Sequence, residues 1–318
     1  MNCNPTRAYS LVVMGAVLHF LVDGLCLCCL YLMAGDGEAS GLVGVFIAYN
    51  MLAFLTQPLT GLLADRLRQP HWLLLLSVLL LSVAVLLAPL SLQGMAVLVP
   101  LSAVLLGVGN SLFHVWGGRQ TVVQAGNDMR ALGLFVSTGA FGLAVAMVCF
   151  SWGLLMALLL ALCLFAMTYV WADRPAPVGT VSVPVGHPSL FGVAVVALVM
   201  LVVATRSYVS GSFSPGGDGS SATVLLVGAA AMLGKMLGGW VATALGWGRA
   251  FVLMAVGVVV CYFWRAQGLP VVLAGLFLVN ATMPVTLYLA NRALPGREAL
   301  AFGLLAAALM PGYLLAMM

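Results

Sequence analysis

The stretch YSLVVMGAVLHFLVDGLCLCCLYLM, residues 9–33, decides the fold class of this chain. It is apolar almost throughout and long enough to cross the hydrocarbon core of a bilayer, which takes about 20 residues of α-helix. The whole sequence shares this character, because 64% of its 318 residues are hydrophobic and only 6% are charged. A soluble domain carries roughly 25% charged residues. We therefore expect an integral membrane protein, and the scattered cations behind its net charge of +4 do not indicate a nucleic-acid partner.

Further apolar runs follow the first, separated by short polar or glycine- and proline-containing breaks. Together they predict an all-α, polytopic membrane protein with about 11 transmembrane helices. A stretch rich in proline, glycine and valine predicts a cytoplasmic linker at residues 173–188, between a six-helix half at 1–172 and a five-helix half at 189–318. The expected spans are Tyr9–Met33, Gly41–Leu63, Trp72–Leu90, Met95–Trp116, Ala131–Phe150, Trp152–Trp171, Ser189–Phe213, Ala222–Leu245, Ala250–Trp264, Pro270–Leu289 and Ala299–Met317.

The positions of the cations predict the orientation of these spans. Cytoplasmic loops of membrane proteins carry an excess of Lys and Arg. With the N-terminus in the cytoplasm, the alternation of spans leaves only Arg265 on the outer side, and an odd number of spans puts the C-terminus there. We expect this topology in the cell (inner) membrane. The cytoplasmic segments then hold Arg7, Arg66, Arg68, Arg119, Arg130, Arg174, Arg249, Arg292 and Arg297.

Short segments of the two halves of the sequence are similar to each other. Residues 61–67 (GLLADRL) and 239–245 (GWVATAL) end the second and eighth spans, and residues 130–134 (RALGL) and 298–304 (EALAFGL) open the fifth and eleventh. Parallel internal repeats are how one large group of secondary transporters is built. We therefore expect two pseudo-repeated halves.

The stretch QPLTGLLADRLRQP, residues 57–70, resembles the loop signature of the major facilitator superfamily. Gly61 allows close helix approach, and Asp65 sits at a helix end where it can cap or pair. Arg66 and Arg68 hold the loop at the anionic leaflet. We expect these four residues to form a conformational motif, in which Asp65 holds the cytoplasmic ends of neighbouring helices in one state.

Four further stretches resemble the fosmidomycin-resistance branch of that superfamily. They are HFLVDG (19–24), GVGNSLFH (107–114), RSYVSGSFSP (206–215) and MPVTLYLANRALPGREALAFGL (283–304), and they touch both halves. The resemblance implies a major-facilitator-like fold in which helices one, four, seven and ten line a central cavity. The superfamily normally has twelve helices, whereas the spans of this chain correspond to the first eleven.

Polar residues at membrane depth are costly and are functional candidates by default. On the first span His19 and Asp23 are four residues apart, and so are Asn110 and His114 on the fourth, so each pair shares a helix face. The resemblance places most of the polar groups around the cavity. The candidate substrate- and proton-coupling residues are His19, Asp23, Asn110, His114, Arg206, Lys235 and Asn280.

Each candidate also has a structural interpretation. Asp23 and Arg206 could neutralise each other across the halves and move nothing, and the asparagines could be interhelical hydrogen-bond partners. In the functional interpretation Asp23, with His19 or His114, carries a proton while Arg206 and Lys235 attract an anionic group. Both interpretations expect Asp23 and Arg206 to lie close enough to pair.

The leading hypothesis is a secondary active transporter, a proton-coupled exporter (antiporter) of a small, anionic molecule or drug. Its partners would be the lipid bilayer, the substrate and protons, without a cofactor. Two alternatives stay open: divalent metal efflux with His19, Asp23 and His114 as ligands, and a non-transporting sensor or assembly subunit. The sequence has neither a nucleophile–base pair nor an H-E-x-x-H motif, which argues against an intramembrane enzyme.

Overall fold

The computed structural model describes residues 5–34, 39–67, 70–92, 95, 97–173, 189–213 and 219–317. Within these ranges the chain is helical with short turns and contains no strand, and 11 helices are long and apolar enough to cross a membrane. The expected all-α polytopic fold and its number of spans are therefore confirmed. Arg68, Met318 and all but the first residue of the expected linker lie outside the described residues.

The helices are numbered along the chain, and three of the spans consist of two consecutive α-helices. Their bounds are α1 (Pro5–Ala34), α2 (Ala39–Leu55), α3 (Gln57–Arg66), α4 (His71–Leu92), α5 (Leu98–Ala125), α6 (Met129–Cys149), α7 (Trp152–Ala172), α8 (Leu190–Ser212), α9 (Ser221–Leu245), α10 (Trp247–Trp264), the 3-10 helix η1 (Arg265–Gln267), α11 (Leu269–Ala281), α12 (Met283–Ala293), α13 (Glu298–Ala307) and α14 (Leu309–Met317).

The fourth span is longer than the sequence suggests. Its helix α5 runs to Ala125 instead of ending near Trp116, so Arg119, expected in a loop, is helical. The helix ends at Gly126, whose φ of 63° is left-handed. Glycine adopts this conformation without the steric cost that a Cβ brings, which is why it ends so many helices.

Threonine and proline explain two of the interrupted spans. Thr56 separates α2 from α3 and Thr282 separates α11 from α12, and each hydroxyl donates to a carbonyl of its own preceding turn, at 2.6 and 2.7 Å. Pro58 and Pro284 follow within the first turn of α3 and α12. Proline has no N–H to continue the ladder, so each span changes course there.

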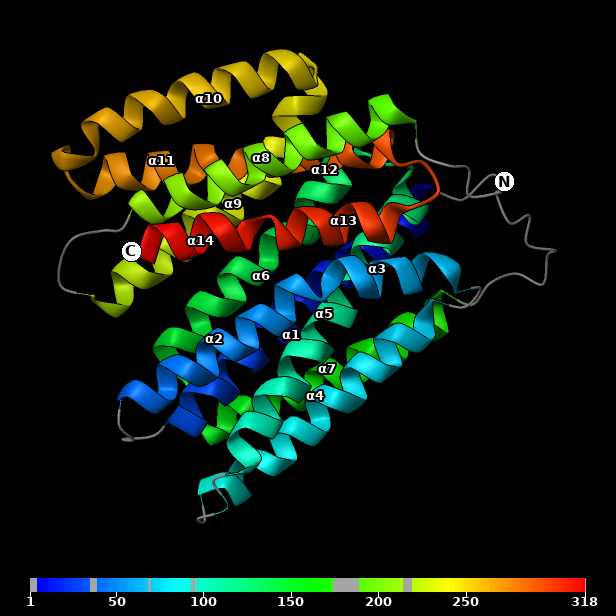
Figure 1. The fold of residues 1–318 in the computed structure, drawn as a ribbon, viewed down its shortest axis with the longest axis vertical. Helices are drawn as coiled ribbons and strands as arrows, with labels where there is room; N and C mark the ends of the chain where they lie inside the picture. The colour runs from blue at the N-terminus through cyan, green and yellow to red at the C-terminus, as the bar shows by residue number, and fades with distance from the viewer. Residues whose placement is uncertain are drawn as a thin grey trace.

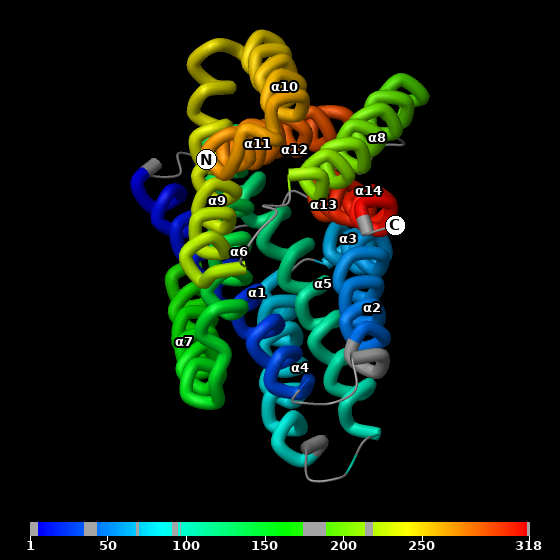
Figure 2. The backbone as a smooth tube through the Cα atoms, turned by 90° about the vertical axis from the view of Figure 1, so that its left-hand side faces the viewer, coloured from blue at the N-terminus to red at the C-terminus, as the bar shows by residue number. Residues whose placement is uncertain are grey.

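The helices form two groups that lie against each other (Figure 1). Figure 2 shows α1 to α7 in the lower part of the molecule and most of α8 to α14 above them, with α9 beside α6. We call these groups the N-terminal and C-terminal halves. They meet mainly through α6 against α9 and α3 against α13. The expected boundary at residues 173–188 stays a prediction.

Glycines allow the two halves to approach closely. A Cβ at Gly133 of α6 would overlap the main chain of Lys235, and one at Gly239 of α9 would overlap the main chain of Met129. Small residues at helix interfaces let backbones come together in membranes, where burying apolar side chains gives little advantage over lipid. The long contact between α6 and α9 therefore depends on the small size of the residues at these positions.

Candidate functional site

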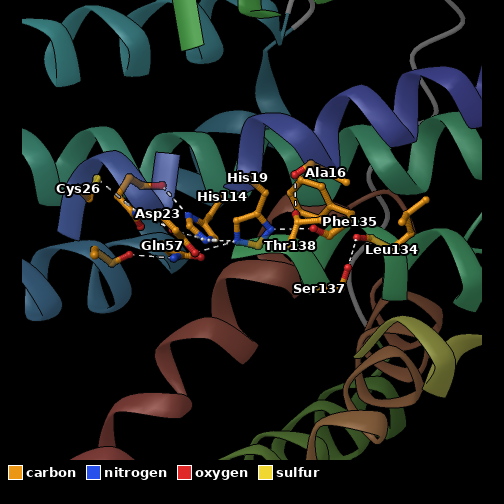
Figure 3. Close-up of polar contacts among 12 residues, drawn as sticks. Ala16, His19, Asp23, Cys26, Gln57, His114, Leu134, Phe135, Ser137 and Thr138 are labelled. Carbon is orange, nitrogen blue, oxygen red and sulfur yellow. Dashed lines mark hydrogen bonds and ion pairs between the residues drawn. The ribbon is translucent and has the colours of Figure 1, made fainter. Parts of the chain in front are cut away.

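Three titratable side chains of the N-terminal half meet in one cluster (Figure 3). His19 Nε2, on α1, is 3.2 Å from Asp23 Oδ2 and 3.0 Å from Nε2 of His114, which comes from α5. His114 Nε2 is also 3.7 Å from Asp23 Oδ1, and the amide of Asn110 donates to the same oxygen at 3.1 Å. The side chains of the three titratable residues are only 6%, 13% and 12% exposed, in chain order. Four of the residues singled out in the sequence are thus in contact.

Main-chain carbonyls hold both imidazole rings. His19 Nδ1 lies 2.7 Å from the carbonyl oxygen of Phe135 on α6, and His114 Nδ1 lies 2.9 Å from that of Asn110, one turn earlier on its own helix. These contacts leave both Nε2 atoms turned toward Asp23 and toward each other. In this structure the two ring orientations are therefore set by hydrogen bonds to the main chain of α5 and α6.

Aromatic side chains surround the pair of histidines. The ring centroids of Phe113 and Phe135 lie 5.9 and 5.0 Å from that of His19. The ring centroid of Phe302, on α13 of the C-terminal half, lies 6.4 Å from that of His114. An apolar surrounding of this kind strengthens every electrostatic interaction inside it.

A cavity of about 160 Å³ lies between the two halves. His19, Asp23 and His114 line it from the N-terminal half, and Arg206 of α8 and Lys235 of α9 line it from the C-terminal half. Most of the remaining lining is apolar. The two cations that the sequence places in different helices therefore share one cavity with the histidine–aspartate cluster.

The expected ion pair between Asp23 and Arg206 is not formed. Asp23 contacts His19, His114 and Asn110 of its own half, which already engage both of its oxygens. Arg206 Nη1 is buried without a hydrogen-bond partner. Lys235 likewise makes no hydrogen bond or ion pair with the part of the chain that the structure describes. The cavity thus holds two positive charges, neither of which forms an ion pair within the described residues.

Asn280 does not line this cavity. Its side chain donates to the carbonyl of Leu276, one turn earlier in α11, at 2.8 Å. The tenth span contributes instead through Met283, Thr286 and Leu287, which follow the break at the start of α12. The change of course at this break decides which residues face the cavity, and apolar periodicity does not reveal it.

Asp65 joins the two halves at one end of the bundle. Its carboxylate, 7% exposed, accepts hydrogen bonds from the backbone N–H groups of Ala299 and Leu300, at 3.0 and 2.9 Å. These groups belong to the first turn of α13, where the helix dipole favours a negative charge. Arg119 Nε lies 3.9 Å from the same carboxylate. The residue therefore caps a helix of the opposite half.

Two glycines allow α3 and α13 to touch at this end. A Cβ at Gly61 would overlap the main chain of Ala299, and one at Gly303 would overlap the main chain of Gln57. Arg66, in the last turn of α3, is the other described residue of the expected motif. Gly61 and Asp65 therefore act on the same partner helix.

Asn127 makes a second polar connection at this end, which the sequence does not reveal. Its side chain donates to the carbonyl of Tyr288 and accepts from the amide of Asn291, both at 3.2 Å. It follows Gly126 in a left-handed turn, with φ of 63°. A Gly-Asn pair is a turn signal, but a single sequence does not show that the side chain reaches the other half.

Gly139 of α6 is another site residue that the sequence analysis missed. A Cβ there would overlap both Asp23 Oδ2 and His19 Nε2. The signal that could have found it is the presence of Gly133, Gly139 and Gly142 in one largely apolar span, since small residues in such spans mark close contacts.

No family model matches the sequence, and no curated protein matches it either. Solved structures do match. A variant of the E. coli fucose:proton symporter FucP aligns with a TM-score of 0.70 and 15% identity over 97% of this chain and 89% of that chain. FucP described in its outward conformation gives a TM-score of 0.71 at 14% identity, with the same coverage. The human organic anion transporter MFSD10 (TETRAN) gives 0.66 at 15% identity over 99% of this chain and 93% of that one.

The chain has the major facilitator fold. Its cavity lies where α1, α2, α5 and α6 face α8, α9, α12, α13 and α14. The more specific resemblance to the fosmidomycin-resistance branch stays a prediction from sequence.

Proposed function

We propose that this chain is a secondary active transporter of the cell membrane that moves a small anionic molecule together with protons. The observation that carries the proposal is the central cavity, shared by two cations without partners and a histidine–aspartate cluster. The fold agrees with it, since proteins of this fold include a fucose:proton symporter and an organic anion transporter.

The unpartnered cations favour an anionic substrate. A charged side chain at the centre of a bilayer costs about 2.5–3.5 kcal/mol even on the lenient insertion scale. A carboxylate or phosphate group between Arg206 and Lys235 would offset this cost, and the planar guanidinium of Arg206 can bind it with two parallel hydrogen bonds. Drug-sized ligands occupy pockets of about 300–1,000 Å³. A cavity of about 160 Å³ suits a smaller molecule.

The charge of the cluster sets the sign of the coupling to protons. Without an added proton, ionised Asp23 repels an anion and attracts Arg206 and Lys235. An added proton neutralises the cluster and leaves both cations to the substrate. Proton and anion therefore favour each other's binding, and this linkage is reciprocal.

This sign fits symport, in which the two bind together. The antiport and export expected from the sequence require that proton and substrate compete. The charges of the cavity instead favour joint binding of proton and substrate. The cavity therefore favours symport, whereas the sequence-based hypothesis was antiport.

The contacts at the Asp65 end suggest how access alternates. Both Asp65 and Asn127 bond across the two halves there, so this end is closed. We assign it to the cytoplasmic side, following the distribution of Lys and Arg in the sequence. Opening it would break these bonds and let the cavity face the cytoplasm.

Flux in proteoliposomes that contain the purified full-length chain tests the proposal. Labelled inorganic phosphate, lactate and succinate are offered with and without an imposed pH gradient. We expect uptake of at least one anion, faster when protons flow in the same direction. Arg206→Gln should abolish it. The matched control is Arg265→Gln, because Arg265 is an exposed cation stacked 4.1 Å above the ring of Tyr262. Equal uptake by the Arg206 variant and the native protein would overturn the proposed site.

Divalent metal efflux is the second candidate. His19, Asp23 and His114 each offer a ligand atom, all within 4.8 Å of one another, and borderline metals favour such donors. Arg206 and Lys235 argue against it, because they put two positive charges in the cavity a dication would enter. We therefore assign no metal site. Flux of Zn²⁺ or Mn²⁺ without anion flux would reverse this choice, and a folded protein without any flux would favour the sensor or assembly subunit.

A further inference from the structure

The carbonyl contacts of the two histidines determine where their protons are. A carbonyl oxygen only accepts hydrogen bonds, so the ring nitrogen facing it must carry a hydrogen. His19 Nδ1 faces the carbonyl of Phe135 at 2.7 Å, and His114 Nδ1 faces that of Asn110 at 2.9 Å. Both rings are therefore protonated at Nδ1.

A neutral imidazole carries only one N–H. If both rings were neutral, both Nε2 atoms would present bare lone pairs. These two atoms lie 3.0 Å apart, which is hydrogen-bond distance. Asp23 Oδ2 lies 3.2 Å from the Nε2 atom of His19. Three acceptors would then face one another in an apolar surrounding, and an arrangement of this kind is costly.

A proton on Asp23 would not resolve the conflict. Protonated at Oδ2, Asp23 could donate to His19 Nε2, yet the two Nε2 atoms would still meet without a hydrogen between them. The Asn110 amide donates to the other carboxylate oxygen at 3.1 Å, a bond that Oδ1 accepts in either protonation state. A proton between the two Nε2 atoms places a hydrogen in their 3.0 Å contact and a positive charge 3.2 Å from ionised Asp23.

We propose that His19 and His114 together bind one proton between their Nε2 atoms, with Asp23 as its counter-charge. We call them the histidine pair. The assignment follows from the contacts, and its role as the coupling proton rests on the proposed function. The hydrogen bond is N–H···N, its positive charge is shared by two rings, and ionised Asp23 makes the cluster neutral.

The groups facing the histidine pair are few. Asp23 of α1 contacts both rings, and Arg206 of α8 and Lys235 of α9 line the same cavity. Cys26 of α1 and Tyr49 of α2 lie on the other side of Asp23, with which they interact. The other helices packed against the pair, α6 and α13, present the phenylalanine rings described above. Asp23 is thus the acid that balances the shared proton, and both cations come from the C-terminal half.

Loss of the shared proton changes the shape of the site as well as its charge. Two bare Nε2 atoms cannot remain 3.0 Å apart, so one ring must turn. His19 is held between Phe135 and Gly139, where even a Cβ does not fit. His114 is the ring that turns. It faces Phe302 of α13, the helix that Asp65 caps, so proton release acts on the contact between the halves.

Nitrogen NMR on the full-length protein, labelled with ¹⁵N-histidine in nanodiscs, tests the assignment without transport. His71 and His187 are replaced by Gln, which leaves the histidine pair; His71 has its own partner, Asp173, at 3.2 Å. We expect both Nδ1 atoms to be protonated, both Nε2 atoms to share one proton, and about one proton to be released per protein on titration. Either ring carrying hydrogen on Nε2 and none on Nδ1 would overturn the assignment.

Variants locate the proton independently. In His114→Gln the amide can donate to His19 Nε2 in place of the shared proton, so the protein should fold and release about one proton fewer. Unchanged proton release would overturn the proposal. So would an infrared band of a protonated carboxylic acid that disappears in Asp23→Asn. A shared proton without any anion flux would refute the proposed function alone, and proton-coupled flux with two independently titrating rings would refute this inference alone.

Discussion

Replacing Asp65 by asparagine isolates the closure of one end of the bundle. The side chain keeps its size, so packing against α13 is unchanged. It loses its charge, and one of its two acceptors becomes an N–H that faces a backbone N–H of Ala299 or Leu300. The folded core of each half is untouched, because the bond runs between the halves.

The loss in free energy of the closed state can be worked out from these two hydrogen bonds. A hydrogen bond to a charged group contributes about 1.5–3 kcal/mol, and a negative charge at a helix N-terminus adds about 0.3–1 kcal/mol. Loss of one such bond and of the charge should therefore destabilise the closed state by about 2–4 kcal/mol. At about 1.4 kcal/mol per factor of ten, the ratio of open to closed molecules rises roughly 30- to 700-fold.

Distances between spin labels measure this ratio. Labels on exposed Leu63 of α3 and exposed Arg292 of α12, in a background without the native cysteines, should show a longer-distance population in Asp65→Asn. The transport rate should fall while substrate affinity stays within a few-fold. Glu298→Gln is the matched control, since its carboxylate accepts from Gly296 N within its own half at 3.1 Å. If both variants give the native distance distribution, the capping argument is wrong.

Three further predictions concern the contact between the halves and the topology. Gly61→Ala should hold α3 and α13 apart and weaken closure by about 1–3 kcal/mol, the usual cost of overpacking. The control is Gly44→Ala, which has nothing within 4 Å of the added Cβ and should give the native distance distribution. Asn127→Gly keeps the left-handed turn but loses two hydrogen bonds, so it should favour the open state by about 1–3 kcal/mol; a transport rate and distance distribution equal to native would show that these bonds do not close the protein. A reporter that works only in the cytoplasm should be active at the N-terminus and silent when fused after Met318, and activity at both ends would mean that one span is misassigned.

Membrane spans are predictable from sequence because their main cause is local. About 20 consecutive apolar residues lower the free energy of a helix in lipid regardless of what it packs against, and all 11 spans appear. The interruptions at Thr56 and Thr282 are different. Each interrupted span is still apolar enough on average to count as one. Hydropathy therefore does not detect the change of course that brings Met283 and Thr286 to the cavity.

Contacts within a helix face were predictable, whereas contacts between helices were less so. The spacing of four residues placed His19 beside Asp23. Which group of another helix meets Asp23 depends on relative translations that no single sequence fixes. The predicted ion pair between Asp23 and Arg206 was therefore wrong, although both residues line one cavity.

Arg206 and Lys235 place two positive charges within the electric field of the membrane, against one negative charge on Asp23. The empty cavity then carries a net charge of about +1, and the shared proton raises it to about +2. Each elementary charge moved through 100 mV is worth about 2.3 kcal/mol. For a carrier that works as proposed, a negative-inside voltage draws the empty, protonated cavity toward the cytoplasm. A bound dianion cancels the charge of about +2. The membrane voltage therefore acts on the unloaded, protonated carrier and hardly at all on the carrier that holds a dianion.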